Sequence, residues 1–341
     1  MIKQNRTNKY IQDFLISNRF KVLSLFFIVT ILLLLILIIS YKLFLVIKNY
    51  KKKTGTSLII NLSDNMYIKK MDSPLIYYHE PKPGLFEEFS EILKSTTVYN
   101  INSDTLNSKS EYKLKKDLKN FRVNFLGDSF TFGQYVNTDN NYVSVLSGKL
   151  NSNRFCSTVD KYELINLGVA AYDIQYTIER YKRRGIKYKP DAVIWLINHW
   201  NLENINEYIY KIQDSLFNNG LSEFDKNSGE YTAAIKARGI YKSRFKEEDV
   251  LNMQNVLLKE FRNIFNGQLI ILYFPIMQNT TRNMLNKIKF KDSKILYYEL
   301  PDLNSKSNLT FPDGHPNEKG HREIADAIYE YITKLSVFCP N

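Results

Sequence analysis

Hydrophobic residues form one long run near the N-terminus of the chain and several short runs after residue 119. The long run, residues 22–41, has 20 positions without a charge, and a helix rising about 1.5 Å per residue would cover the roughly 30 Å of a bilayer core. More apolar residues and then lysines follow it, where a cleaved signal peptide would have small residues. We therefore predict an uncleaved membrane anchor over residues 22–47, preceded by a basic segment, residues 1–21. A buried core helix is the alternative.

The short runs after residue 119 have the length of buried strands, and stretches with helical periodicity lie between them. Such alternation is typical of a parallel sheet that helices cover on both faces. We predict a three-layer α/β/α domain over residues 119–335 with a five-stranded, mainly parallel sheet. The predicted strands are residues 123–126, 164–167, 192–197, 269–274 and 295–298.

Two other segments depart from this alternation. Residues 48–118 are polar and are interrupted by Pro74, Pro81 and Pro83, so we expect a stalk or N-terminal extension there. Residues 202–265 form an insertion between the third and fourth predicted strands and carry many aromatic residues. These aromatics either pack the insertion onto the domain, which we favour, or form a lid that contacts a sugar ring or an acyl group.

The chain has a formal net charge of +12, and most of it lies at the N-terminus. Ten of the 47 Lys and Arg residues, but one of the 35 acidic residues, fall within positions 1–53. A nucleic-acid-binding protein needs its positive charge clustered on the folded domain, so we predict no nucleic-acid partner. The N-terminal lysines are expected to meet lipid headgroups. Five basic residues stand on each side of the long apolar run, so charge does not fix its orientation.

Cysteine and histidine usage limits the chemistry. Cys156 and Cys339 could pair in an oxidising compartment or remain free thiols. Neither a CxxC nor an HExxH spacing occurs among the two cysteines and four histidines. We therefore expect no metal site and no cofactor.

Two short motifs supply the residues of a serine nucleophile site. Gly-Asp-Ser at residues 127–129 follows the first predicted strand, and Asp-Gly-His at residues 313–315 stands near the C-terminus. A hydroxyl becomes a strong nucleophile when a neighbouring base takes its proton and a third group orients that base. Ligands of such sheets bind at the carboxyl ends of the strands, where Ser129 falls. Ser129, His315 and Asp313 are therefore the candidate triad.

The chain from about residue 122 to residue 332 resembles the SGNH or GDSL hydrolases, because four sequence blocks occur in the family's order. The first block reads GDSFTFG, and the fourth opens the last predicted helix with Asp-Gly-His-Pro-Asn. Much of the family has Asp-x-x-His in the fourth block. This chain has Asp-x-His, a spacing shared with relatives that carry the longer His-Pro-Asn ending. The four blocks are residues 127–133, 165–169, 197–201 and 313–321.

The resemblance implies a role for each matched triad residue. Ser129 would attack the carbonyl carbon of an ester. His315 would take the hydroxyl proton and later give it to the leaving alcohol, while Asp313 would hold the imidazole.

The resemblance also implies an oxyanion hole. Its donors would be the backbone N–H groups of Ser129 and Gly168 and the side chain of an asparagine in the third block. Counting from residues 190–191 favours Asn201, with Asn198 as the alternative.

As a whole, the resemblance implies an ester hydrolase that removes acetyl or short acyl groups from a carbohydrate or another envelope component. An O-acyltransferase that modifies an extracytoplasmic polysaccharide is the alternative. A non-catalytic binding module is the second alternative, which the intact triad disfavours. Anchored relatives modify envelope polysaccharides, so the resemblance places the catalytic domain outside the cytoplasm. The expected partners are an acyl-ester or glycan substrate and membrane lipid, and the sequence leaves open whether there is a protein partner.

Overall fold

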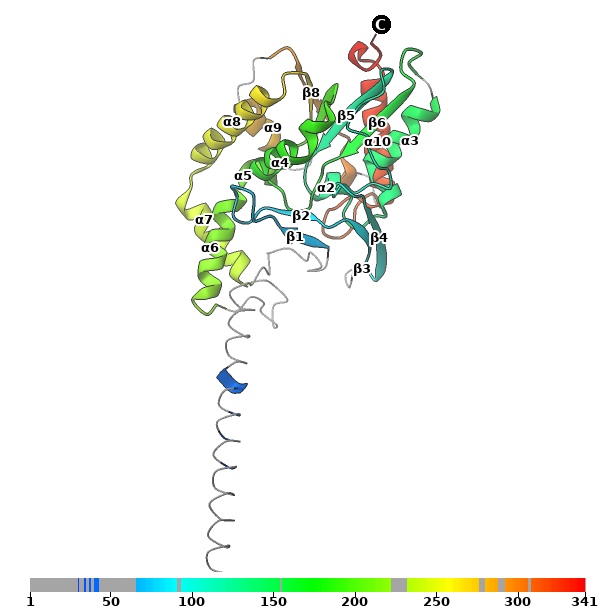
Figure 1. Cartoon of the computed structure of the whole chain (residues 1–341). Helices are drawn as coiled ribbons and strands as arrows, with labels where there is room; N and C mark the ends of the chain where they lie inside the picture. Colours follow the sequence, from blue (N-terminus) through cyan, green and yellow to red (C-terminus); the bar gives the residue numbers. More distant parts are fainter. Residues whose placement is uncertain are drawn as a thin grey trace, which may run out of the picture. The chain divides into compact units, whose positions relative to one another are not determined.

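The structure is a computed structural model in which the chain divides into two compact units, Met1–Thr56 and Ser57–Asn341 (Figure 1). It describes residues 30, 34, 37, 40–42, 66–90, 93–153, 155–221, 232–275, 280–287, 292–305 and 308–340. The basic segment 1–21 lies outside the described residues, as does nearly all of the predicted anchor 22–47. Within the described ranges, no helix is both long enough and apolar enough to cross a membrane.

The central sheet of the second unit consists of five parallel strands: β5 (Asn120–Leu126), β6 (Lys161–Asn166), β7 (Ala192–Leu196), β8 (Gln268–Tyr273) and β9 (Ile295–Glu299). Their order across the sheet is β6-β5-β7-β8-β9. Each of the five predicted apolar runs overlaps one of these strands, and the three-layer α/β/α prediction is confirmed. Because β5 pairs with both β6 and β7, the segments that follow these three strands emerge close together.

Helices cover both faces of this sheet, which explains why the strand runs show no polar alternation. On one face, α3 (Tyr142–Asn153) and α10 (Glu318–Ile332) pack against side chains such as Ile194. On the other face, α4 (Ile174–Arg180) and α8 (Glu247–Ile264) share an apolar cluster with Trp195. Successive strand residues point to opposite faces, so the two layers bury alternate positions of one strand.

Two helices of the predicted insertion, α6 (Asn206–Asn218) and α7 (Thr232–Arg244), pack against each other. Tyr210 and Tyr241 are buried in a cluster that also contains Tyr172 of the α/β domain. These aromatics therefore pack the insertion onto the domain. The remaining helical segments are α2 (Ser129–Phe132), α5 (His199–Glu203), α9 (Thr280–Lys287), η1 (Thr138–Asn140), η2 (Tyr181–Gly185), η3 (Ile186–Tyr188), η4 (Leu303–Ser305) and η5 (Ser336–Phe338).

The N-terminal extension folds into two antiparallel hairpins from residue 66 onward. Met66, Tyr99 and Ile101 are buried in one apolar cluster with Phe132 of α2. The described part of the predicted stalk or extension thus packs on the α/β domain, within the same compact unit. The hairpins pair β1 (Tyr67–Lys69) with β2 (His79–Pro81), and β3 (Gly84–Ser90) with β4 (Ser95–Ile101).

A disulfide bond joins Cys156, which follows α3, to Cys339 near the C-terminus. The two residues are 183 positions apart in the sequence. The sequence leaves open whether the two cysteines are paired or free thiols, and in the structure they are paired. The bond holds the end of the chain against the layer formed by α3 and α10.

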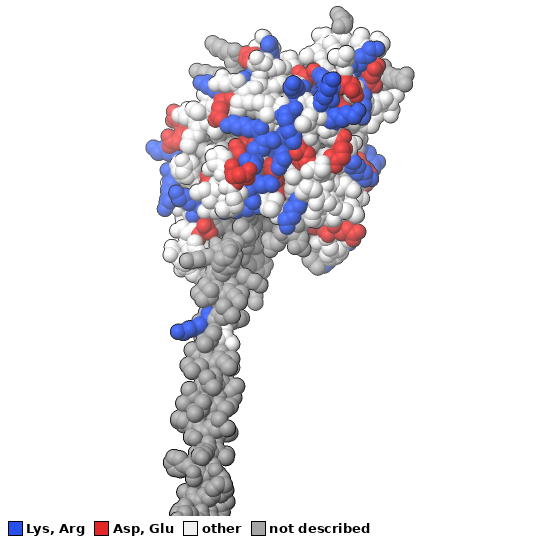
Figure 2. All heavy atoms as spheres, in the orientation of Figure 1, with Lys and Arg blue, Asp and Glu red and all other residues white. Residues whose placement is uncertain are grey.

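Charged side chains of both signs are intermixed on the face of the second unit that Figure 2 displays. Ion pairs such as Lys182 with Glu260 and Arg262 with Asp292 join neighbouring charges. This distribution agrees with the nearly balanced charge of the sequence after position 53.

Candidate active site

Ser129 is the first residue of α2 and follows β5 through a tight turn. The turn requires Gly127, whose φ is 151°, because a Cβ there would lie 2.2 Å from Thr131 Oγ1. Asp128 caps the helix, since its Oδ1 accepts a 3.0 Å hydrogen bond from Phe130 N. The turn therefore places the Ser129 hydroxyl at the carboxyl edge of the sheet, where α/β domains bind ligands.

The structure brings Ser129, His315 and Asp313 together in one hydrogen-bonded chain. His315 Nε2 lies 2.8 Å from Ser129 Oγ, and His315 Nδ1 lies 3.0 Å from Asp313 Oδ2. Asp313 Oδ1 also accepts a 3.1 Å hydrogen bond from the backbone N–H of His315. Gly314, with φ of 89°, turns the chain back on itself. The Asp-x-His spacing therefore gives Asp313 two contacts with the candidate base.

Asp313 is held as a carboxylate at neutral pH. Burial raises its pKa, but the hydrogen bonds and charge of His315 and a hydrogen bond from Tyr135 outweigh burial and lower that pKa. An ionised Asp313 accepts from Nδ1–H, which leaves Nε2 to accept the Ser129 proton. The three groups thus have the order and geometry that acyl transfer by a serine requires.

Aromatic rings fix the orientation of the His315 imidazole. The ring of Phe130 lies 5.1 Å from it at 33°, and the ring of Tyr135 lies 5.4 Å away at 86°, both measured between ring centroids. Phe130 in turn contacts Phe274, which follows β8. The sequence gives no signal for Tyr135, because it reaches the site only through the fold of the loop after α2.

Gly168 does not offer the free N–H group that the sequence predicts. Its backbone N–H donates a 3.0 Å hydrogen bond to Asn166 Oδ1. A Cβ at position 168 would lie 2.4 Å from Phe132 N and 2.6 Å from Thr131 C. The glycine therefore permits close packing of this loop under α2, and its predicted role in the oxyanion hole is corrected on this ground.

The two candidate asparagines differ in how their amide hydrogens are used. Asn201 is buried, and its Nδ2 donates to Tyr172 O at 2.8 Å and to Asp128 Oδ2 at 3.2 Å. Both of its amide hydrogens are therefore engaged. Asn198 is half-buried and donates to Asp128 Oδ2 at 2.8 Å. Its second amide hydrogen has no acceptor among the described residues. The structure thus favours Asn198, and the preference for Asn201 is corrected.

Ala171 is a backbone donor candidate that the sequence does not reveal. It has φ of 59°, in the left-handed region that favours glycine, and it is half-buried. Its carbonyl accepts a 2.7 Å hydrogen bond from Asn206 Nδ2, which fixes the peptide group between residues 171 and 172. Its N–H has no acceptor in the described part of the chain. An alanine in this conformation carries no sequence signal, because glycine is the residue that marks such positions.

The other histidines do not replace His315. His321 is buried in α10, and burial lowers its pKa to about 3. Its Nδ1 accepts a 3.2 Å hydrogen bond from Tyr142 N, so it is structural. Burial also lowers the pKa of His199 at the start of α5. Across the described ranges, no group of three or more His, Cys, Asp or Glu side chains is placed to hold a metal ion.

No protein-family model matches this chain, and no curated protein matches its sequence. A psychrotrophic esterase from Pseudoalteromonas sp. is a similar solved structure: it covers 62% of this chain and 97% of its own, with 17% identity and a TM-score of 0.41. A putative lipolytic protein of the G-D-S-L family from Desulfitobacterium hafniense DCB-2 covers 61% and 98%, with 17% identity and a TM-score of 0.38. A catalytic mutant of an acetylxylan esterase from Geobacillus stearothermophilus covers 62% and 94%, with 15% identity and a TM-score of 0.38.

These structures are described as esterases and a G-D-S-L protein. Their TM-scores lie below 0.5, so the roles of individual residues rest on the geometry of this chain.

Proposed function

We propose that this chain is a serine ester hydrolase of the SGNH type that removes acetyl or other short acyl groups. The observation that carries the proposal is the continuous chain from Ser129 Oγ to His315 Nε2 at 2.8 Å and from His315 Nδ1 to Asp313 Oδ2 at 3.0 Å. A serine that merely caps a helix needs no base, and a buried structural histidine needs no second partner of this kind.

The reaction follows from these contacts. Ser129 Oγ forms a bond to the ester carbonyl carbon while His315 Nε2 takes the hydroxyl proton. The tetrahedral intermediate collapses as the bond to the alcohol breaks, and the alcohol leaves with the proton from Nε2. Water then attacks the acyl-enzyme with the same base and releases the acid. Asp313 stays ionised and stabilises the imidazolium in both halves.

The intermediate's negative oxygen needs preorganised donors. Ser129 N–H stands at the N-terminus of α2, where N–H groups have no intrahelical acceptor. Asn198 supplies its second amide hydrogen, and Ala171 N–H is the third donor that we assign. One such donor contributes about 3 to 4 kcal/mol in well-studied serine enzymes, which makes it a measurable part of the rate.

Solvent access favours water as the acyl acceptor. The side chains of His315 and Asp313 are 20% and 31% exposed, so water can reach the base. A transferase must exclude water from its acyl-enzyme. Acetylated polysaccharides are the first natural substrates to test, because one of the similar structures is an acetylxylan esterase.

We further propose a membrane-anchored enzyme whose catalytic domain lies outside the cytoplasm. The apolar run at residues 22–41 supports the anchor, with membrane lipid as its partner. The disulfide between Cys156 and Cys339 supports an oxidising compartment. A reporter that is active only outside the cytoplasm, fused to the C-terminus, should be active. Activity of a cytoplasm-specific reporter at the same position would contradict this topology.

The function is tested with the full chain in detergent and p-nitrophenyl acetate as substrate. Ser129→Ala should lower kcat by at least about 10³-fold, because the nucleophile is lost. Ser147→Ala, at a partly exposed serine of α3, is the matched control and should retain wild-type activity. Equal rates for Ser129→Ala and wild type would refute the triad. A wild-type enzyme that leaves the ester intact in water but acetylates an oligosaccharide from an activated donor would establish the transferase instead.

A further inference from the structure

The two N-terminal hairpins contact α2 and the loop that follows it. Tyr99 of β4 packs on Phe132 of α2, with 5.2 Å between ring centroids. The loop is bonded to the same strand: Asn137 Oδ1 accepts from Val98 N, and Thr138 Oγ1 accepts from Asn100 N, each at 2.8 Å. A segment outside the five-stranded sheet therefore holds one side of the candidate active site.

The other hairpin contacts the loop that carries Ala171. His79 of β2 is buried, and its Nε2 lies 3.4 Å from Ala170 O. Burial lowers the pKa of His79 to about 4, so the imidazole is neutral at pH 7. The hydroxyl of Tyr172 donates in return to His79 O. The loop after α2 and the loop that carries Ala171 are thus both hydrogen-bonded to the N-terminal extension.

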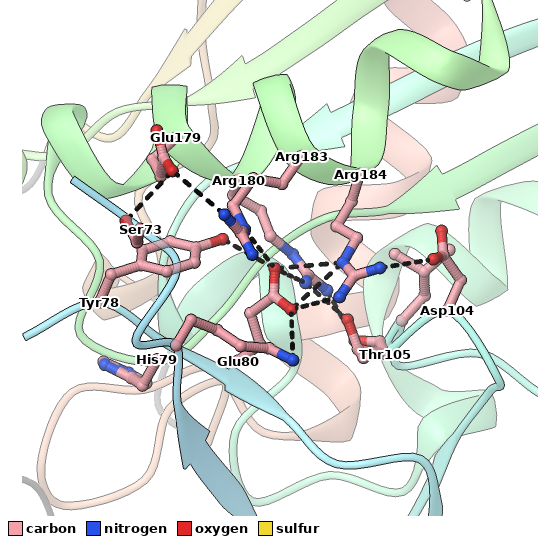
Figure 3. Close-up of polar contacts among 12 residues, drawn as sticks. Ser73, Tyr78, His79, Glu80, Asp104, Thr105, Glu179, Arg180, Arg183 and Arg184 are labelled. Atoms are coloured by element: carbon pink, nitrogen blue, oxygen red, sulfur yellow. Dashed lines mark hydrogen bonds and ion pairs between the residues drawn. The ribbon is translucent and has the colours of Figure 1, made fainter. Parts of the chain in front are cut away.

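A single arginine cluster anchors both hairpins. Figure 3 shows Arg180 and Arg184, from α4 and η2, pointing toward the Glu80 carboxylate of β2. The contacts measure 3.1 Å from Arg180 Nη1 and 2.6 Å from Arg184 Nη2. Arg180 also donates two 2.6 Å hydrogen bonds to Thr105, and Arg184 Nη1 lies 3.0 Å from Asp104 Oδ1, both after β4. These contacts hold both hairpins firmly against the α/β domain.

Tyr135 connects the N-terminal hairpins to the triad. Its φ of 69° is unfavourable for a residue with a bulky side chain. Its backbone N–H donates a 2.8 Å hydrogen bond to Tyr99 Oη, which holds the peptide in that conformation. Burial and the charge of Asp313 raise the pKa of Tyr135 to about 12, so its hydroxyl stays protonated. It can therefore donate to the Asp313 carboxylate while its ring rests against His315.

We propose that Tyr135 is a positioning residue of the triad and that Tyr99, from a hairpin outside the α/β domain, holds Tyr135 in place. The Tyr135 hydroxyl orients Asp313, and its ring limits rotation of His315. The activity readouts of this inference rest on the proposed function. The inference makes the extension a part of the active site.

The first test is the pH dependence of kcat for p-nitrophenyl acetate with Tyr135→Phe. A carboxylate that has lost a donor is a stronger base and holds the imidazolium more tightly. The acid limb of the profile should therefore move to higher pH, whereas a purely structural loss would lower kcat at all pH values alike. An unshifted acid limb would overturn the role of the hydroxyl. The other titratable groups that act on Tyr135 or His315 are Glu88, Tyr99, Asp128 and His321, and they are unchanged in this variant.

The second test is a double-mutant cycle. Tyr99→Phe removes the acceptor of Tyr135 N–H without touching the triad and should lower kcat several-fold with little change in KM. In a Tyr135→Ala background the same change should have no further effect on kcat, because the side chain it positions is absent. Tyr162→Phe is the matched control, since it removes a buried hydroxyl that donates to Phe338 O. Additive effects of Tyr99→Phe and Tyr135→Ala, or an equal loss with Tyr162→Phe, would overturn the proposal.

Hydrogen exchange separates this inference from the proposed function. The amide of Tyr135 should exchange faster in Tyr99→Phe than in wild type, and Tyr162→Phe should leave it unchanged. Faster exchange in a protein that cleaves no ester would refute the hydrolase but support the hydrogen bond from Tyr135 N–H to Tyr99 Oη. Unchanged exchange would refute the positioning role at any level of activity.

Discussion

Glu80→Gln is expected to destabilise the fold far more than the loss of a surface ion pair. The Glu80 side chain is fully buried and faces Arg180, which is also fully buried, and Arg184. Burial raises the pKa of Glu80, but the charges and hydrogen bonds of these arginines outweigh it and lower the pKa from 4.5 to about 2. That difference corresponds to about 3 kcal/mol of stability at neutral pH. Breaking a buried ion pair by removing one partner costs a similar amount, about 3 to 5 kcal/mol.

The pH dependence of this loss has a definite sign. A carboxylate whose pKa is lower in the folded state stabilises the fold above its unfolded pKa and loses that effect as pH falls. The difference in unfolding free energy between wild type and Glu80→Gln should therefore be full above about pH 5 and shrink toward pH 2. Urea unfolding of the full chain, followed by the fluorescence of Trp195 and Trp200, measures it.

Glu260→Gln is the matched control for this experiment. Glu260 pairs with Lys182 at the surface, where the two side chains are 46% and 40% exposed. Its replacement should change stability by less than about 1 kcal/mol. If the two variants lost equal stability, or if the loss from Glu80→Gln stayed constant down to pH 2, the ionised Glu80 would not anchor the hairpins.

Three further predictions concern the site and the disulfide. Asn198→Ala should lower kcat about 10²- to 10³-fold, because an oxyanion donor is lost. Asn201→Ala should mainly lower the unfolding free energy. A kcat loss confined to Asn201→Ala would reverse the assignment of the oxyanion donor. Asp313→Asn should lower kcat by about 10⁴-fold, because an amide no longer selects the productive imidazole tautomer, and activity within tenfold of wild type would speak against that role. Cys339→Ser opens a loop of 183 residues to Cys156 and should lower the unfolding free energy by up to about 5 kcal/mol, with an unchanged urea midpoint as the contrary result.

The sheet could be predicted from the sequence because its strands are covered on both faces. All five residues of β7 are buried, so the run from Ala192 to Leu196 contains no polar position. The hairpins lack this signature. In β3, Leu85 and Phe89 are exposed while Phe86 is half-buried, because one face of the hairpin meets solvent. Such a segment is as polar as a linker, and only its contacts with residues far along the chain give it a defined fold.

The triad could be proposed because its chemistry is carried by side chains in two short motifs. Backbone donors have no such signature. The glycine at position 168 does allow close approach, but the group that approaches it is the backbone of α2, at 2.4 Å from where a Cβ would stand. The left-handed residue of the same loop is Ala171, whose φ of 59° is set by its neighbours and not by its own side chain.

Counting positions along the sequence cannot identify which of Asn198 and Asn201 donates its side-chain amide to the oxyanion hole. The two residues form a reciprocal cap: Asn198 Oδ1 accepts from Asn201 N, and Asn201 Oδ1 accepts from Asn198 N. Locally they are equivalent, and each also sends an amide hydrogen to Asp128 Oδ2. They differ only in a contact from another loop, because Tyr172 O takes the remaining hydrogen of Asn201. That carbonyl lies 29 residues away in sequence. Tertiary packing therefore determines which asparagine keeps an amide hydrogen for a substrate, and that residue is Asn198.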